Sequence, residues 1–269
     1  MLTQFFFGSN PWLLPAVLLL VLGLSIELPF RFWKVPDESR VTDGTFNTMQ
    51  AALFTLGAFV LGLSFAQASA RYDVRRVLVV KEANSIGTTW LRAGQLQPAD
   101  AAKFRRILTD YTAIRLKAYS TPGQPQLYQQ ALDESDRDQA ALWSIASGSL
   151  RAHDSNLGLS LLVQTLNDTI DVSAEQLQAL RGRVPTAMLI LMIVLIALGT
   201  LSIGIRFARD QSRPALMSAI FVIASVVVIN MVIDYDRPQT GFVNVNLDPL
   251  KRQLQSMQSP GPGNQPSLR

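Results

Sequence analysis

Four long stretches almost free of charged side chains constrain the fold of this chain more than any other feature. A helix needs ~20 mostly apolar residues to cross the ~30 Å hydrocarbon core of a bilayer, because each residue adds ~1.5 Å. Four segments meet this requirement, and Glu27 is the one charged residue inside them: residues 12–30, 49–70, 184–205 and 215–233. A soluble domain of this size would not need four helices that are apolar all round. The pattern therefore predicts an all-α protein with four transmembrane helices.

The longest connection, residues 71–183, lies between the second and third of these spans. Its apolar residues recur at spacings of three and four, which predicts a helical domain inserted into the membrane-spanning part. The first helix of this domain is expected to continue out of the second span as far as Gly94. Outside the spans, residues 1–11 form a short N-terminal segment and residues 234–255 a membrane-surface segment. Residues 256–269 are rich in Pro, Gly, Ser and Gln, which predicts a disordered tail.

The distribution of basic residues predicts the orientation in the membrane. With four spans, both termini and the inserted domain lie on one side, and cytoplasmic segments next to spans carry an excess of Lys and Arg. That side has nine such residues and the other side has six, which favours cytoplasmic termini and a cytosolic inserted domain in a cell inner membrane. The nine are Arg71, Arg75, Arg76, Lys81, Arg181, Arg183, Arg237, Lys251 and Arg252; the six are Arg31, Lys34, Arg40, Arg206, Arg209 and Arg213.

The sequence offers little support for an enzyme. It has no cysteine and a single histidine, His153, which together exclude a His- or Cys-based metal site. No phosphate-binding loop or nucleophile motif is present, and the acidic cluster of residues 133–138 is best interpreted as a solvated helix face. We therefore expect no catalytic activity, no cofactor and no metal. The net charge of +4 comes without a nucleic-acid-binding motif, so we attribute it to contact with the anionic lipid bilayer and expect no nucleic-acid partner.

The second span carries two rows of residues spaced by four. One row is made of small side chains, which let another helix approach closely. The other row has two interpretations from spacing alone. It could contact lipid or the rest of the bundle, or, if several copies surround an axis, it could form stacked apolar rings that gate by dewetting. The small row is Ala58, Gly62, Ala66 and Ala70, and the other row is Thr55, Phe59 and Leu63.

A polar cluster follows the fourth span, and it consists of Asn230, Asp234, Asp236 and Arg237. Polar and ionisable side chains at the membrane edge cost free energy, so they indicate partners or a functional role. An interfacial ion pair followed by a turn at residues 238–241 is the simpler alternative.

The second span and the exit of the fourth resemble known sequences. Residues 59–73, FVLGLSFAQASARYD, resemble the pore-helix stretch of the bestrophins, with Phe59, Gly62 and Arg71–Tyr72 in the same register. The exit of the fourth span is similar to the bacterial bestrophin pattern of an acidic residue, Pro-Phe-Gly and Asn-Asp-Leu-Pro-Leu, although Pro-Phe-Gly is here residues 238–241, PQTG. Most of residues 10–255 is similar to a bacterial family of bestrophin-like membrane proteins.

Bestrophins are pentameric anion channels with four spans per subunit, a cytosolic helical domain and cytosolic termini. The resemblance therefore implies a homo-oligomer, with five copies as the family's number, that conducts inorganic anions such as chloride. It implies that Thr55, Phe59 and Leu63 form the pore neck and that Arg71 lies at the cytosolic mouth. The acidic calcium clasp of eukaryotic members has no counterpart here. The alternative is a non-conducting membrane scaffold or sensor, a monomer or dimer, whose cytosolic helices bind a partner.

Overall fold

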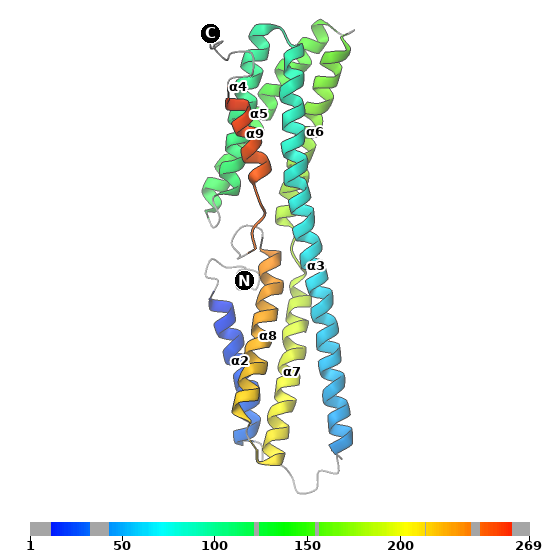
Figure 1. Ribbon diagram of the computed structural model, residues 1–269, viewed down its shortest axis with the longest axis vertical. Coiled ribbons are helices and arrows are strands. Elements are labelled where there is room, and N and C mark those ends of the chain that lie inside the picture. The colour runs from blue at the N-terminus through cyan, green and yellow to red at the C-terminus, as the bar shows by residue number, and fades with distance from the viewer. Residues whose placement is uncertain are drawn as a thin grey trace, which may run out of the picture. The chain divides into compact units, whose positions relative to one another are not determined.

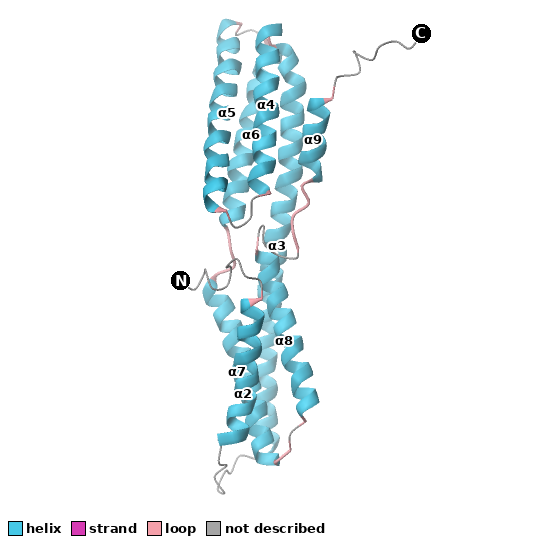
Figure 2. Ribbon diagram, turned by 90° about the vertical axis from the view of Figure 1, so that its left-hand side faces the viewer, coloured by secondary structure: helices cyan, strands magenta, loops and turns pink. Residues whose placement is uncertain are grey.

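The computed structural model of the protein describes residues 12–32, 43–120, 124–153, 156–212, 214–237 and 243–259. All regular elements within these ranges are helices (Figure 2). Four of the described helices are long and apolar enough to cross a membrane. The predicted all-α fold with four membrane-spanning helices is therefore confirmed. The expected N-terminal segment, the turn at residues 238–241 and the tail from residue 260 onward lie outside the described residues.

From α3 to α8 the helices follow one another with connections of five residues or fewer. α4 and α5 each begin at a proline, which suits the first helical turn because the missing N–H has no partner there in any case. The elements are α2 (Leu13–Phe32), α3 (Asp43–Arg92), the 3-10 turn η1 (Ala93–Gln95), α4 (Pro98–Tyr119), α5 (Pro125–Ala152), α6 (Leu157–Arg181), α7 (Thr186–Asp210), α8 (Ala215–Asp236) and α9 (Asp248–Gln258).

These helices form two compact units. Met1–Tyr72 and Arg183–Val243 make up the membrane unit, and Asp73–Gly182 and Asn244–Arg269 make up the insert unit. α3 contributes residues to both, since it is a single helix of 50 residues. The expectation that the second span continues as one helix to near Gly94 is thus confirmed, with the helix ending at Arg92.

In the membrane unit, α2 packs against α7 and α8 (Figure 1). Its buried residues, Leu14, Leu18, Leu22 and Ile26, recur every four positions and so lie on one face. Gly204 of α7 allows the closest approach, because a Cβ there would collide with the backbone of Ile26. The other faces of the four helices carry exposed apolar side chains. Leu20, Met217 and Val227 are examples, and such exposure is typical of residues that face lipid.

The insert unit has a conventional apolar core. α4 supplies Phe104, Leu108 and Tyr111, all fully buried, and Leu142 of α5 and Leu162 of α6 meet them. Full burial of one such side chain contributes roughly 1.5–3 kcal/mol, so this layer accounts for much of the cohesion of the unit.

α9 differs from the expectation of a membrane-surface segment followed by a tail from residue 256. Residues 248–258 form a helix that belongs to the insert unit and packs against α4. Leu250 is fully buried and Met257 is 7% exposed, both in the core of that unit. The physical reason is amphipathicity, because Leu250, Leu254 and Met257 follow spacings of four and three, and the acidic Asp248 lies in the first turn.

Candidate functional site

The first half of α3 has one face turned toward its own chain and one face that is not covered. Val60 and Ala68 lie in the core of the membrane unit, and Ser64 on the same side is fully buried. The row predicted from the sequence lies elsewhere on the helix. Phe59 is 63% exposed and Leu63 is 43% exposed. Thr55 is also exposed, and its hydroxyl donates a hydrogen bond to the carbonyl oxygen of Ala51 at 2.8 Å, so it can face an apolar environment without an unpaired donor.

The small-residue row lies beside this exposed row. Ala58, Gly62, Ala66 and Ala70 are all exposed. A Cβ added at Gly62 would meet no atom within 4 Å. Among the described residues, the close packing of α3 on its own chain uses different positions, since Phe54 contacts Gly199 of α7 and meets Phe221 of α8 edge-to-face at 5.4 Å. The small row thus remains open for another helix.

The polar cluster at the end of α8 is buried and binds backbone groups. Asp236, which is fully buried, accepts a hydrogen bond from the backbone N–H of Val184 at 2.8 Å. Asp234, 6% exposed, accepts one from the backbone N–H of Val243 at 2.9 Å. These carboxylates hold the segments that enter α7 and leave α8. Arg237 is also buried, whereas Asn230 is partly exposed and does not share these contacts.

Arg71, the residue expected at the mouth, is partly exposed on α3. Its neighbour Tyr72 packs against Tyr235 of α8 with ring centroids 5.6 Å apart, and Phe65 meets the same Tyr235 ring at 5.5 Å. An aromatic cluster therefore fixes this part of α3 to α8 beside Arg71.

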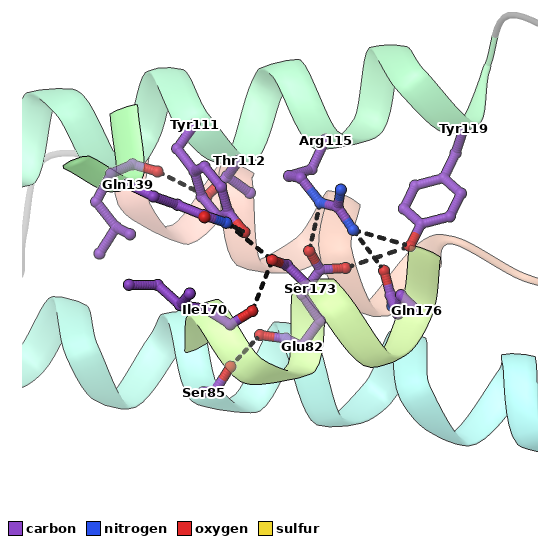
Figure 3. A network of polar contacts seen from close by, with 11 residues as sticks. Glu82, Ser85, Tyr111, Thr112, Arg115, Tyr119, Gln139, Ile170, Ser173 and Gln176 are labelled. Atoms are coloured by element: carbon purple, nitrogen blue, oxygen red, sulfur yellow. Dashed lines mark hydrogen bonds and ion pairs between the residues drawn. The ribbon is translucent and has the colours of Figure 1, made fainter. Parts of the chain in front are cut away.

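A buried ion pair in the insert unit was not predicted from the sequence (Figure 3). Arg115 of α4 donates from Nε to Glu82 Oε1 of α3 at 2.6 Å and from Nη2 to Gln176 Oε1 of α6 at 2.8 Å. Glu82 is fully buried and Arg115 is 5% exposed. Tyr119, four residues after Arg115, completes the group with a hydroxyl 3.5 Å from both charged side chains. Arg115 thus joins α4 to α3 through an ion pair and to α6 through a hydrogen bond.

The surroundings of this pair shift the pKa values of its members. Burial alone lowers the pKa of the Arg115 guanidinium, but the charge of Glu82 and the nearby tyrosine hydroxyls outweigh it, and the net pKa is raised. Burial, and then the charge of Glu82, raises the pKa of the Tyr119 hydroxyl well above its usual value. Arg115 therefore stays charged and Tyr119 stays neutral at physiological pH.

The sequence carries a signal for this pair on one face of α3. Glu82 lies four residues after Leu78 and four before Ile86, both buried on the same face of α3. A charged residue in register with an apolar face indicates a buried partner. The partner itself could not be identified, because Arg115 is 33 residues away in the sequence.

The acidic residues of α5 do not assemble into a metal site. No group of three or more metal-ligating side chains occurs in the part of the chain that the structure describes. Asp138 is partly buried, and burial together with the charges of Asp110 and Glu134 raises the pKa of its carboxyl.

The chain is similar to known proteins in sequence and in fold. Residues 16–250 match the family model of the Bestrophin-like domain. No curated protein matches the chain. The fold is similar to that of a bacterial bestrophin homologue from Klebsiella pneumoniae, with a TM-score of 0.64 at 14% identity, covering 93% of this chain and 100% of that one. A leucine-to-threonine variant of the same homologue gives 0.66 at 14% identity, with 94% and 100% covered. A further structure, of a membrane protein variant, gives 0.66 at 14%, with 90% and 98% covered.

Proposed function

Because this chain belongs to the family of the Bestrophin-like domain, we propose that it is an ion channel built from several copies, with the first half of α3 lining the pore. Among the described residues, apolar side chains from all four spans fill the core of the membrane unit, so we expect conduction to require an assembly of several copies. The family's number of five copies is the expected one. The permeant ions are proposed to be inorganic anions, in line with the basic residues that adjoin the spans.

The observation that carries this proposal is the uncovered face of α3. Phe59 is more exposed than nearly every other large apolar side chain of α3, although its helix packs against the chain on the opposite side. If copies of α3 surround an axis, Thr55, Phe59 and Leu63 stack as successive rings. Apolar rings of this kind control ion passage by excluding water rather than by charge.

The small-residue row supports the same arrangement. Ala58, Gly62, Ala66 and Ala70 flank the exposed row and leave room for a neighbouring helix. In a membrane, close helix contacts of this kind are favoured by van der Waals packing, since apolar side chains gain nothing by leaving lipid. We propose that this row meets the next copy of the chain.

We propose that the channel lies in the inner membrane of the cell, with the insert unit and both termini in the cytoplasm. This orientation follows from the excess of basic residues on that side. Arg71 would then lie at the cytosolic mouth of the pore, where its positive charge raises the local anion concentration. Charge reversal at Arg71 should shift permeability toward cations.

The absence of cysteine makes the pore assignment directly testable. Single cysteines at Leu63 and Leu198 form a matched pair, because both leucines are 43% exposed in candidate spans, one on α3 and one on α7. A membrane-impermeant thiol reagent reaches a cysteine in the pore when the rings open to water, but it does not reach a cysteine that faces lipid. In vesicles, the reagent should label Leu63→Cys and reduce ion flux, and should leave Leu198→Cys unlabelled and conducting. Equal reaction of both, or unchanged flux after labelling of Leu63→Cys, would contradict the assignment.

Widening the ring gives a second readout. Phe59→Ala should raise ion flux or loosen selectivity, and native mass spectrometry of the solubilised protein should give a multiple of the 29.6 kDa subunit mass, with five copies expected. A monomer or dimer without flux would instead support the non-conducting scaffold or sensor.

A further inference from the structure

Glu27 is the one charged residue inside the four apolar stretches, and in the structure it lines a cavity. It lies five residues before Phe32, the last residue of α2, which is ~7.5 Å along a helix axis at ~1.5 Å per residue. Leu19, Gly23 and Glu27 are spaced by four, so they share a face of α2 next to the buried face that packs on α7 and α8. An ionisable side chain inside a span indicates a binding role or a structural partner.

The cavity has a volume of about 270 Å³ and lies between α2, α7 and α8, wholly within the membrane unit. Among the described residues that line it, Glu27 and Ser218 are the two with polar side chains. The Ser218 hydroxyl donates a hydrogen bond to the carbonyl oxygen of Pro214 at 3.1 Å, so Glu27 dominates the polarity of the cavity. Small residues leave the space open. Gly23 of α2 faces Ala215 and other small residues of α8, and a Cβ added at Gly23 would meet no atom within 4 Å.

These walls suit a cation attached to an apolar body. A carboxylate binds an ammonium group through charge-assisted hydrogen bonds, and its two oxygens accept several of them, so Glu27 can do this alongside its interactions within the chain. Phe30 and Phe207 line the same cavity, and aromatic rings attract cations. The volume corresponds to roughly nine water molecules at ~30 Å³ each, which suits a ligand of roughly ten non-hydrogen atoms and is too small for a whole bilayer lipid.

We propose that this cavity binds a compact hydrophobic amine, whose ammonium group contacts Glu27 and whose apolar body lies against α7 and α8. A primary amine is charged at neutral pH, because its pKa is ~10. The apolar walls strengthen the attraction between the ammonium group and the carboxylate, since they lower the local dielectric constant. The site is independent of the proposed channel function, because binding is measured without ion flux.

The probe for this site is phenethylammonium, and its binding is measured by calorimetry with the full-length protein in phosphatidylcholine nanodiscs, corrected against empty nanodiscs. We expect saturable binding, with the uncharged 2-phenylethanol binding about ten-fold more weakly or worse. Glu27→Gln should weaken the binding of phenethylammonium by about ten-fold or more and leave that of 2-phenylethanol unchanged. Gly23→Leu should weaken the binding of both molecules, because the added side chain fills the cavity.

Asp210 supplies a matched control outside the cavity. It lies three residues after Phe207 on α7, and its carboxylate pairs with Arg206 at 2.7 Å. Asp210→Asn should bind phenethylammonium as the wild type does. No saturable binding, equal binding of the amine and the alcohol, wild-type binding by Glu27→Gln, or equal weakening in Asp210→Asn overturns the inference.

A lipid with an ammonium headgroup is the other occupant of similar chemistry. Nanodiscs of phosphatidylethanolamine test it, because this lipid carries a primary ammonium group at high local concentration. Undiminished binding of phenethylammonium in these nanodiscs is expected. Loss of binding there assigns the cavity to the lipid headgroup and overturns a compact amine as its ligand.

Discussion

The buried pair between Glu82 and Arg115 allows a sharp test of how the insert unit is held together. Each residue is shielded from water, so replacing one of them by methionine leaves the other as an uncompensated buried charge. Breaking a buried ion pair in this way typically costs about 3–5 kcal/mol. Glu82→Met and Arg115→Met should therefore each lower the free energy of unfolding by about that amount. Lys81, the preceding residue, provides the control, because its ion pair is half exposed and Lys81→Met should cost about 0–1 kcal/mol.

The double variant distinguishes a buried charge from lost packing. With both charges removed, no charge stays buried, and the remaining cost comes from the Gln176 amide oxygen and the Tyr119 hydroxyl, which lose their partners. An unsatisfied buried group of this kind costs about 1–3 kcal/mol, so the double variant should be more stable than either single variant. Hydrogen exchange of α4 reports the effect locally. A loss of 3–5 kcal/mol corresponds to exchange faster by about 100-fold to a few thousand-fold. Additive losses in the double variant, or equal losses in Glu82→Met and Lys81→Met, would refute the reasoning.

Three further predictions concern packing and titration, each checked by thermal unfolding. Gly204→Ala forces a methyl group against the backbone of Ile26 and should cost about 1–3 kcal/mol, whereas Gly62→Ala, with open space around it, should leave the subunit's stability unchanged. Asp138→Asn should raise the midpoint temperature of unfolding at pH 7, where it removes a carboxylate that burial and its acidic neighbours disfavour. Because the pKa of Asp138 is raised in the folded state, the stability that protonation gives is lost as the pH rises through that pKa. The benefit of the variant should therefore vanish near pH ~3, where the carboxyl is protonated in the folded and the unfolded chain. The raised pKa of Tyr119 contributes stability that is fully present below pH ~10 and is lost as the pH rises through the pKa of the folded state. Tyr119→Phe removes this titration, so the variant should lose less stability than the wild type at alkaline pH. An equal loss in both proteins would contradict this prediction.

Helix positions followed from the sequence with small errors at the ends. The helix that contains the second predicted span begins at Asp43, before residue 49, and the helix that contains the third ends at Asp210, after residue 205. Charged residues outside the apolar window extended these helices, because hydrogen bonding along a helix does not stop where hydrophobicity does. α9 was missed, since its eleven residues are mostly polar and only Leu250 and Met257 become deeply buried.

The candidate site was predictable in part. Spacing grouped Thr55, Phe59 and Leu63 on one face, but two interpretations remained, because periodicity identifies a face without identifying what covers it. Exposure of that face in the folded subunit favours a role in contacts outside the subunit. For the membrane-edge carboxylates, the sequence indicated that a partner was needed but not which one. Asp236 was predicted from its charge, and its partner is the backbone N–H of Val184, 52 residues earlier.

The sequence by itself determined that this is an all-helical membrane protein, because the length of an apolar stretch and its charge content are local properties that set the cost of crossing lipid. Only the tertiary structure decided which face of α3 stays open and which buries Glu82. Those outcomes depend on where α4 and α6 pack against α3, and on Gln176 meeting Arg115 from 61 residues away. A buried charge requires its partner from whichever helix the fold brings beside it, and no local pattern encodes that choice.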